Sequence, residues 1–300
     1  MRRVTPGAHP LIRAAWLAGA ALLVIAGVVE LVARGRAAVF VLAASVVLFV
    51  ASYVAYLVRH FLFLAEVARA DRALAAGDLE KARALLAPLL DVYPDLAPVQ
   101  RAAGLTLYRR GDPLSAASLL EHASRSYGDD VVVATTLVAS YAALNRGGDA
   151  RRASGLVPRA VDVRLALAWS ELVALGGDRA AGIALAAELA GRADVSATAA
   201  RSAMAHALAA IAAARRADAS AAIGPLRLLR AEAAGLPAEE RAFLGYLEGV
   251  ALRELGRTTE AIAAFDRAIE AAPDTIGEAL ARRERAGLVA RPQAPSHTEG

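Results

Sequence analysis

The chain opens with two long apolar runs before the pattern changes to that of water-soluble helices. Residues 14–33 and 37–59 are almost entirely apolar, and the short polar turn Arg34-Gly35-Arg36 joins them. At about 1.5 Å of rise per residue, each run is about 30 Å long, which matches the hydrocarbon core of a bilayer. We therefore predict an N-terminal hairpin of two transmembrane helices, with residues 1–62 as a membrane anchor.

A cleaved signal peptide is the alternative for the first run, because Arg2 and Arg3 precede it. A second apolar run follows at once and no clean cleavage site separates the two, which favours a retained anchor. Arginines outside the two runs outnumber those in the turn between them, so the positive-inside bias predicts that both ends, and hence the repeats, lie in the cytoplasm. Glu30 is the one acid within a run, and we interpret it as reaching interfacial water close to the turn.

No glycine or proline separates the second apolar run from the polar sequence that follows it. Arg59 and His60 mark the expected headgroup level, and Phe63, Val67 and Leu74 then recur at helical spacing. The sequence predicts one continuous helix over residues 37–76, about 60 Å long, in which the first repeat is a rigid extension of the anchor.

Beyond residue 60, helical patterning is interrupted at intervals of about 36 residues. Glycine can end a helix in the left-handed conformation, and a following aspartate can cap the next helix, so each interruption predicts the turn of a helical hairpin. The predicted turns are Gly77-Asp78, Gly111-Asp112, Gly148-Asp149, Gly177-Asp178, Ala217-Asp218 and Gly256-Arg257.

Around the last turn the small, aromatic and proline positions follow a fixed order, and this order resembles the tetratricopeptide repeat. The same order recurs less completely in the first two units. The repeat-defining residues are Gly77, Ala82 and Pro94 in the first unit, Gly104, Gly111, Ala116 and Ala123 in the second, and Gly249, Gly256, Ala261, Phe265, Ala268 and Pro273 in the last. In the units between, the resemblance rests on spacing alone.

The resemblance implies an all-α fold, in which the transmembrane hairpin is followed by an α-solenoid of about six helix pairs over residues 63–287. A charged helix near residues 276–287 is predicted to close the stack with a polar face. The Pro-rich tail, residues 288–300, is predicted to be disordered. The predicted pairs are 63–94, 97–128, 131–158, 162–191, 196–235 and 238–272.

The net charge of +4 is unevenly divided, because residues 1–62 carry +5 and the remainder therefore carries −1. A nucleic-acid-binding role requires positive charge on the folded part, so the sequence argues against one. The chain has no cysteine, which excludes disulfides and thiolate chemistry. Abundant alanine and arginine, with Lys81 the only lysine, are typical of a GC-rich bacterial genome.

No catalytic, cofactor-binding or metal-binding motif occurs, so we predict a protein that is not an enzyme and has no cofactor. The two Gly-Gly-Asp stretches at Gly147 and Gly176 lack the Glu-Phe of nucleotide-cyclising enzymes and are interpreted as repeat turns. Asp129 and Asp130 suggest a paired-carboxylate metal site, but they precede a helix, so capping is the preferred interpretation.

Family members commonly bind a peptide or protein along the surface formed by the first helix of each repeat. The corresponding candidate groove is Asp71, Arg101, Leu105, Tyr108 and Arg109. It contains no Lys or Asn, which argues against the carboxylate-clamp subclass. Arg and Tyr are frequent binding anchors and favour an acidic or aromatic ligand, whereas a solvated helix face is the alternative.

Taken together, these features predict a membrane-anchored scaffold that recruits or organises partner proteins at the bacterial inner membrane, in contact with lipid through two spans. The alternative is an assembly or regulatory subunit of a larger membrane enzyme or transporter, recognised through its transmembrane helices. Partner identity, pathway and oligomeric state do not follow from the sequence.

Overall fold

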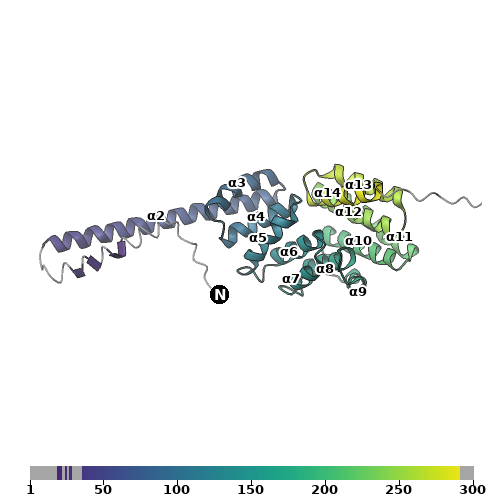
Figure 1. Ribbon diagram of the computed structural model, residues 1–300, viewed down its shortest axis with the longest axis horizontal. Helices are drawn as coiled ribbons and strands as arrows, with labels where there is room; N and C mark the ends of the chain where they lie inside the picture. Colours follow the sequence, from purple (N-terminus) through teal and green to yellow (C-terminus); the bar gives the residue numbers. More distant parts are fainter. Residues whose placement is uncertain (1–18, 22–23, 26, 29–35, 291–300) are drawn as a thin grey trace, which may run out of the picture. The chain divides into compact units, whose positions relative to one another are not determined.

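The computed structural model describes residues 19–21, 24–25, 27–28 and 36–290 of the 300-residue chain (Figure 1). Throughout this described part the regular secondary structure is helical. The helices are α2 (Arg36–Ala75), α3 (Leu79–Val92), α4 (Ala97–Arg109), α5 (Pro113–Ser124), α6 (Val131–Ala143), α7 (Gly147–Ser154), α8 (Val161–Val173), α9 (Arg179–Ala190), α10 (Ala199–Arg215), α11 (Ala219–Ala233), α12 (Ala238–Glu254), α13 (Thr258–Ala271) and α14 (Ile276–Val289). The chain divides into two compact units, residues 1–102 and 103–300, so the division falls within α4.

The predicted continuous helix is confirmed, because α2 runs without interruption from Arg36 to Ala75, over 40 residues. Its apolar part meets the length and composition of a membrane span and is almost entirely exposed, unlike the core helix of a soluble protein. Of the predicted hairpin, the described residues contain this one clear span candidate. The proposed first span, residues 14–33, falls largely outside the described residues, as does Glu30.

The first repeat is fastened to α2 where the predicted span ends. Arg59 Nε donates a hydrogen bond to the Tyr93 hydroxyl at 2.8 Å, and the Phe63 ring meets Tyr93 edge-on at 5.1 Å. Phe63 is therefore buried against the repeat, as its place in the apolar stripe that follows Arg59 predicts. Exposed apolar side chains continue beyond Arg59 to Phe61 and Leu62, which are 66% and 63% exposed.

Six helix pairs follow one another as predicted, and most turns use the expected chemistry. Gly77 and Gly111 adopt φ of 78° and 80°. The aspartate that follows each glycine caps the next helix, since Asp78 accepts from the Lys81 amide and Asp112 from the Ser115 amide, both at 3.0 Å. Turns Ala217-Asp218 and Gly256-Arg257 also reverse the chain at the predicted glycine or alanine, with φ of 57° and 74°.

Two predicted turns are wrong by one to three residues. The third turn is made by Asn145, with φ of 59°, and Gly147 and Gly148 already belong to α7. Asparagine tolerates the left-handed region, which removes the need for glycine there. Gly147 is instead required for packing, because a Cβ on it would lie 3.0 Å from the backbone nitrogen of Gly177. In the fourth turn the left-handed residue is Gly176, not Gly177.

The paired helices of residues 103–300 form two layers. The first helices α6, α8, α10, α12 and finally α14 pack each against the next, and the second helices α7, α9, α11 and α13 cover them from outside. Side chains at the repeat-defining positions fill the space between the two helices of a pair. Ala82, Ala116, Ala123, Ala261, Phe265 and Ala268 are all at most 1% exposed.

Two glycines permit close helix crossings in this arrangement. A Cβ on Gly104 would lie 2.7 Å from Leu120 Cγ, and a Cβ on Gly249 would lie 2.4 Å from Phe265 Cε1. These two positions must therefore be glycine because the facing side chain leaves no room for a Cβ. Pro94 and Pro273 stand just past α3 and α13 and end these pairs.

Helix α14 ends the stack and confirms the predicted terminal helix at residues 276–287, with two further residues at its end. Its start is capped by Thr275, and the Glu278 carboxylate accepts from the Asp274 amide at 2.6 Å. Ile276 and Leu280 are buried, whereas charged side chains cover the other face. The tail beyond residue 290 lies outside the described residues.

Candidate ligand-binding pocket

The unit formed by residues 103–300 curls round until its first and last helices meet. Arg109 at the end of α4 donates through both Nε and Nη2 to the Glu239 carboxylate at the start of α12. Arg283 of α14 donates to the Ala143 carbonyl oxygen of α6 at 2.8 Å. These two connections bring first helices far apart in the sequence to opposite sides of one space.

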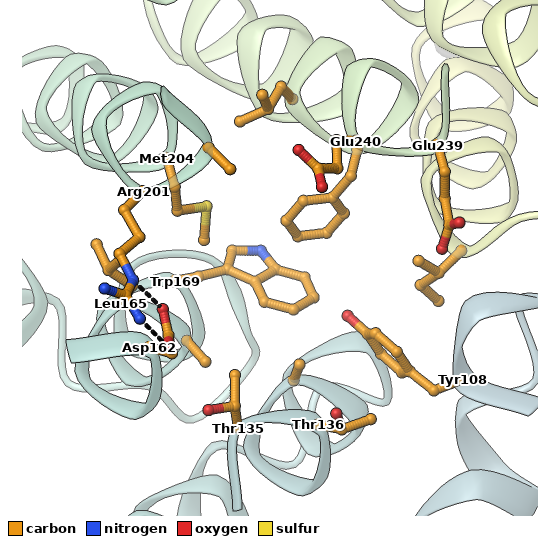
Figure 2. A pocket seen from close by; sticks show the side chains of 16 residues that line it. Tyr108, Thr135, Thr136, Asp162, Leu165, Trp169, Arg201, Met204, Glu239 and Glu240 are labelled. Atoms are coloured by element: carbon orange, nitrogen blue, oxygen red, sulfur yellow. Dashed lines mark hydrogen bonds and ion pairs between the residues drawn. The ribbon is translucent and has the colours of Figure 1, made fainter. Parts of the chain in front are cut away.

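That space is a cavity of about 320 Å³, lined by the first helix of five successive pairs and by the start of α14 (Figure 2). Its volume lies at the lower end of the range for ligand pockets. The lining residues are Tyr108, Thr135, Thr136, Ala139, Asp162, Leu165, Ala166, Trp169, Ala200, Arg201, Met204, Glu239, Glu240, Phe243, Leu244 and Ile276.

An aromatic cluster forms the floor of the pocket. The Trp169 ring, 1% exposed, meets the Phe243 ring edge-on at 5.0 Å and the Tyr246 ring at 6.4 Å. Figure 2 shows the indole of Trp169 at the centre, with Tyr108, Met204 and Glu240 around it. These contacts hold Trp169 rigidly, so the floor is formed before any ligand arrives.

Three of the four charged side chains in the lining are neutralised by partners. Arg201 of α10 makes a bidentate pair with Asp162 of α8, with both N···O distances 2.7 Å. Glu239 is held by Arg109 in the same manner. Both pairs join different helices, so they fix the shape of the rim as well as its charge.

Glu240 is the rim charge that has no such partner. No guanidinium of the described residues lies within ion-pair distance of its carboxylate, which is exposed at the pocket edge. Burial raises the pKa of Glu240, the neighbouring Glu239 charge raises it further, and Arg109 opposes the change. The pocket consequently carries a net negative charge.

Two polar atoms of the lining residues are closed to solvent, the Trp169 Nε1–H and the Thr135 hydroxyl oxygen. The indole interacts with the neighbouring Tyr246 hydroxyl, which is also buried. Burial raises the pKa of Tyr108, with smaller contributions from Tyr246 and Glu239, so its hydroxyl is a hydrogen-bonding group that remains protonated.

The structure places the five predicted groove residues in different surroundings. Asp71 and Arg101 form an ion pair at 3.7 Å within residues 1–102. Leu105 is 6% exposed and belongs to the core, and Arg109 is engaged with Glu239. Tyr108 does line the pocket. Both arginines of the predicted groove thus have a carboxylate partner, and the binding role of the groove stays a prediction.

The sequence reasoning identified the first helices as the binding surface but missed most residues of the pocket. Trp169, Met204, Phe243 and Glu240 lie on three different helices, and their grouping depends on how far the stack curves. Trp169 was the available signal, since a tryptophan on the first helix of a repeat is a frequent binding anchor.

The preferred interpretation of the Asp129-Asp130 pair is confirmed. The Asp130 carboxylate caps α6, accepting from the amides of Val132 at 2.8 Å and Val133 at 3.2 Å. Across residues 36–290 and the short described stretches before them, no three His, Asp or Glu side chains lie close enough together to hold a metal ion.

A second, polar cavity of about 580 Å³ lies between α11, α12 and α13. Arg230 and Arg267 both donate to one oxygen of the buried Glu248 carboxylate, at 2.7 and 3.1 Å. Both arginines are more than half exposed, and the arrangement pins the outer helices to α12. We interpret this cluster as structural.

Comparison with known families supports the repeat assignment. Residues 245–275, which cover the end of α12 and all of α13, match the family model of the tetratricopeptide repeat. The described helices fit an α-solenoid, and its last helix pair resembles a tetratricopeptide repeat. No curated protein matches the chain.

Proposed function

We propose that this protein is a membrane-anchored tetratricopeptide-repeat scaffold, which binds a segment of a partner protein in the pocket formed by its first helices. The observation that carries the proposal is the pocket itself, whose floor is aromatic and preformed and whose lining comes from five successive repeat units. Repeats of this class generally mediate interactions between proteins, and the chain lacks recognisable catalytic motifs.

In this proposal the membrane anchor acts by holding the repeats, and any bound partner, close to the membrane. In this proposal, α2 and the preceding apolar run cross the bacterial inner membrane and leave the repeats in the cytoplasm. Because α2 continues into the first repeat and Arg59 is bonded to Tyr93, this repeat is attached without a flexible linker. Partners would be confined to a thin layer at the membrane, where their effective concentration is raised.

Filling the pocket tests whether it is the binding site. Ala200 lines the pocket in the first turn of α10, and its neighbour Ala199 is exposed and lies outside the lining. The variant Ala200→Trp should abolish partner binding, whereas Ala199→Trp, with the same added bulk on the same turn, should not. A photoreactive amino acid at Met204 would record binding in cells as crosslinks that Ala200→Trp removes. Crosslinks that persist in Ala200→Trp would contradict the proposal.

Membrane orientation has a direct test, because the native chain contains no cysteine. Leu175 lies in the turn between α8 and α9 and is 75% exposed, so Leu175→Cys places a single thiol on the repeat surface. The thiol should react with a membrane-impermeant maleimide only after the inner membrane is broken. Labelling in intact spheroplasts would instead place the repeats outside.

A second candidate function is an assembly or regulatory subunit recognised within the membrane. It is favoured by the exposed side chains along the apolar part of α2, such as Val47 at 66% and Val54 at 50%, which leave a face for another membrane helix. Replacing residues 1–58 by an unrelated anchor separates the two functions. A scaffold that binds through its pocket keeps its partner, and a subunit recognised through its spans loses it.

A further inference from the structure

The pocket has an unbalanced charge that its own residues do not explain. Asp162 and Glu239 are each held by an arginine from another helix, while Glu240 has no cationic partner among the described residues. Glu240 lies in the first turn of α12, where the helix dipole favours a carboxylate. Its raised pKa indicates that burial and the adjacent Glu239 outweigh this benefit.

A second, independent observation is the aromatic floor beside this charge. Trp169 is 1% exposed, and Figure 2 shows its indole at the centre of the pocket, with Glu240 at the edge. The indole Nε1–H interacts with the buried Tyr246 hydroxyl and is closed to solvent, as is the Thr135 hydroxyl oxygen. The pocket thus offers a ligand an unpaired carboxylate next to an aromatic and apolar surface.

The remaining lining is apolar and narrow. Leu165, Met204 and Phe243 lie between the floor and the rim, and the volume of about 320 Å³ accommodates one long side chain with its neighbours but not a whole helix. A ligand that fits these features has an apolar stem and a positive charge at its end. A lysine or arginine side chain, with its methylene stem, has this chemistry.

We infer that the pocket recognises a basic side chain of a partner protein, with the cationic head paired to Glu240 and the stem lying on the apolar wall. This inference rests on the proposed function and specifies its ligand. An acidic segment is excluded from the pocket by the same carboxylate.

Peptide libraries test this chemistry without knowledge of the partner. The full chain is reconstituted in nanodiscs of neutral phosphatidylcholine, so that basic peptides are not held by anionic lipid, and empty nanodiscs give the background. The probes are short acetylated and amidated peptides of random sequence, in which one central residue is fixed as Arg, Lys, Met or Glu. The retained fraction of each library is measured by mass spectrometry.

The native protein should retain the Arg and Lys libraries about five-fold better than the Met library, the size expected for an ion pair at an exposed rim. Glu240→Gln should remove this preference and leave Met-library binding intact. Glu270→Gln is the matched control, since Glu270 is exposed on α13 and lies outside the pocket. A preference for basic peptides that survives in Glu240→Gln overturns the inference.

The Ala200→Trp variant distinguishes this inference from the proposed function. If Ala200→Trp abolishes binding of every library while the native protein shows no preference for basic residues, the inference fails and the pocket remains the binding site. If no library binds, or if binding is unaffected by Ala200→Trp, both fail. The far-UV circular dichroism of each variant and its midpoint of thermal unfolding confirm that it is folded.

Discussion

Replacing Gly249 by alanine should destabilise the last helix pair, although alanine is the better helix former. The added Cβ would lie 2.4 Å from Phe265 Cε1, 2.5 Å from Cδ1 and 2.8 Å from Cζ. Carbon atoms in good contact are about 3.5 to 4.0 Å apart, so the ring would have to move by about 1 Å. Phe265 is fully buried, and such a movement displaces its neighbours as well.

The magnitude follows from two opposing effects. Overpacking a buried site costs about 1 to 3 kcal/mol, and the severity of this clash places the cost near the upper end. The change from glycine to alanine within a helix returns about 1 kcal/mol. We therefore expect Gly249→Ala to lower the free energy of unfolding by about 2 kcal/mol. Gly287 in α14 has open space around it, so Gly287→Ala should be neutral or stabilising by up to about 1 kcal/mol.

Trp169 reports on this region, because its ring contacts Phe243 of α12. In a Trp16→Phe background it is the only tryptophan, and its fluorescence during urea unfolding in detergent gives the midpoint for each variant. Phe265→Leu makes room for the new methyl group, so the double variant should be more stable than the sum of the single effects by at least about 1 kcal/mol. Strict additivity, or a Gly249→Ala variant as stable as its parent, would refute the reasoning.

Three further predictions concern charge and helix continuity. The pKa of Glu240 is raised in the folded state, so its ionised carboxylate destabilises the protein above the folded-state pKa and has no such effect below the unfolded-state pKa. Glu240→Gln should therefore be more stable than the native protein at neutral pH and lose this advantage in acid. Equal pH profiles of the free energy of unfolding in urea would contradict this prediction. Arg109→Ala leaves the half-buried Glu239 carboxylate unpaired and should cost about 2 kcal/mol, part of which Arg109→Ala/Glu239→Ala recovers; a double variant less stable than Arg109→Ala would be the opposite result. Spin labels at Val46→Cys and Glu66→Cys should give a single narrow distance distribution near about 30 Å, and a broad or two-peaked distribution would exclude the continuous helix.

Local chemistry made much of this fold predictable. The left-handed glycines Gly77 and Gly111, each followed by a capping aspartate, define turns that depend on only a few residues. The absence of any helix breaker predicted α2 in the same way. The prediction was wrong at Asn145 and Gly147, where a contact between two successive turns decides which residue must be glycine. The sequence of one turn gives no information about this contact with the next turn.

Contacts between distant residues also explain why the candidate site could not be predicted from the sequence. From the sequence, Arg101 and Arg109 were open binding groups and Glu240 was an ordinary residue at a helix start. In the structure both arginines have carboxylate partners, and Glu240 faces a pocket without one. The sign of the expected ligand charge changes as a result.

The sequence by itself therefore determined the helical repeats, four of the six turns, the glycines at helix crossings and the continuous helix leading out of the apolar segment. All of these depend on residues within about one repeat of one another. Tertiary structure alone decided where the pocket lies and what charge it carries. Arg109 and Glu239 are 130 residues apart, and only the accumulated rotation of several repeats brings them into contact. The small rotations between neighbouring helix pairs add up along the stack. The residues that face the pocket are therefore determined by all the repeats of this unit together and cannot be found from one repeat.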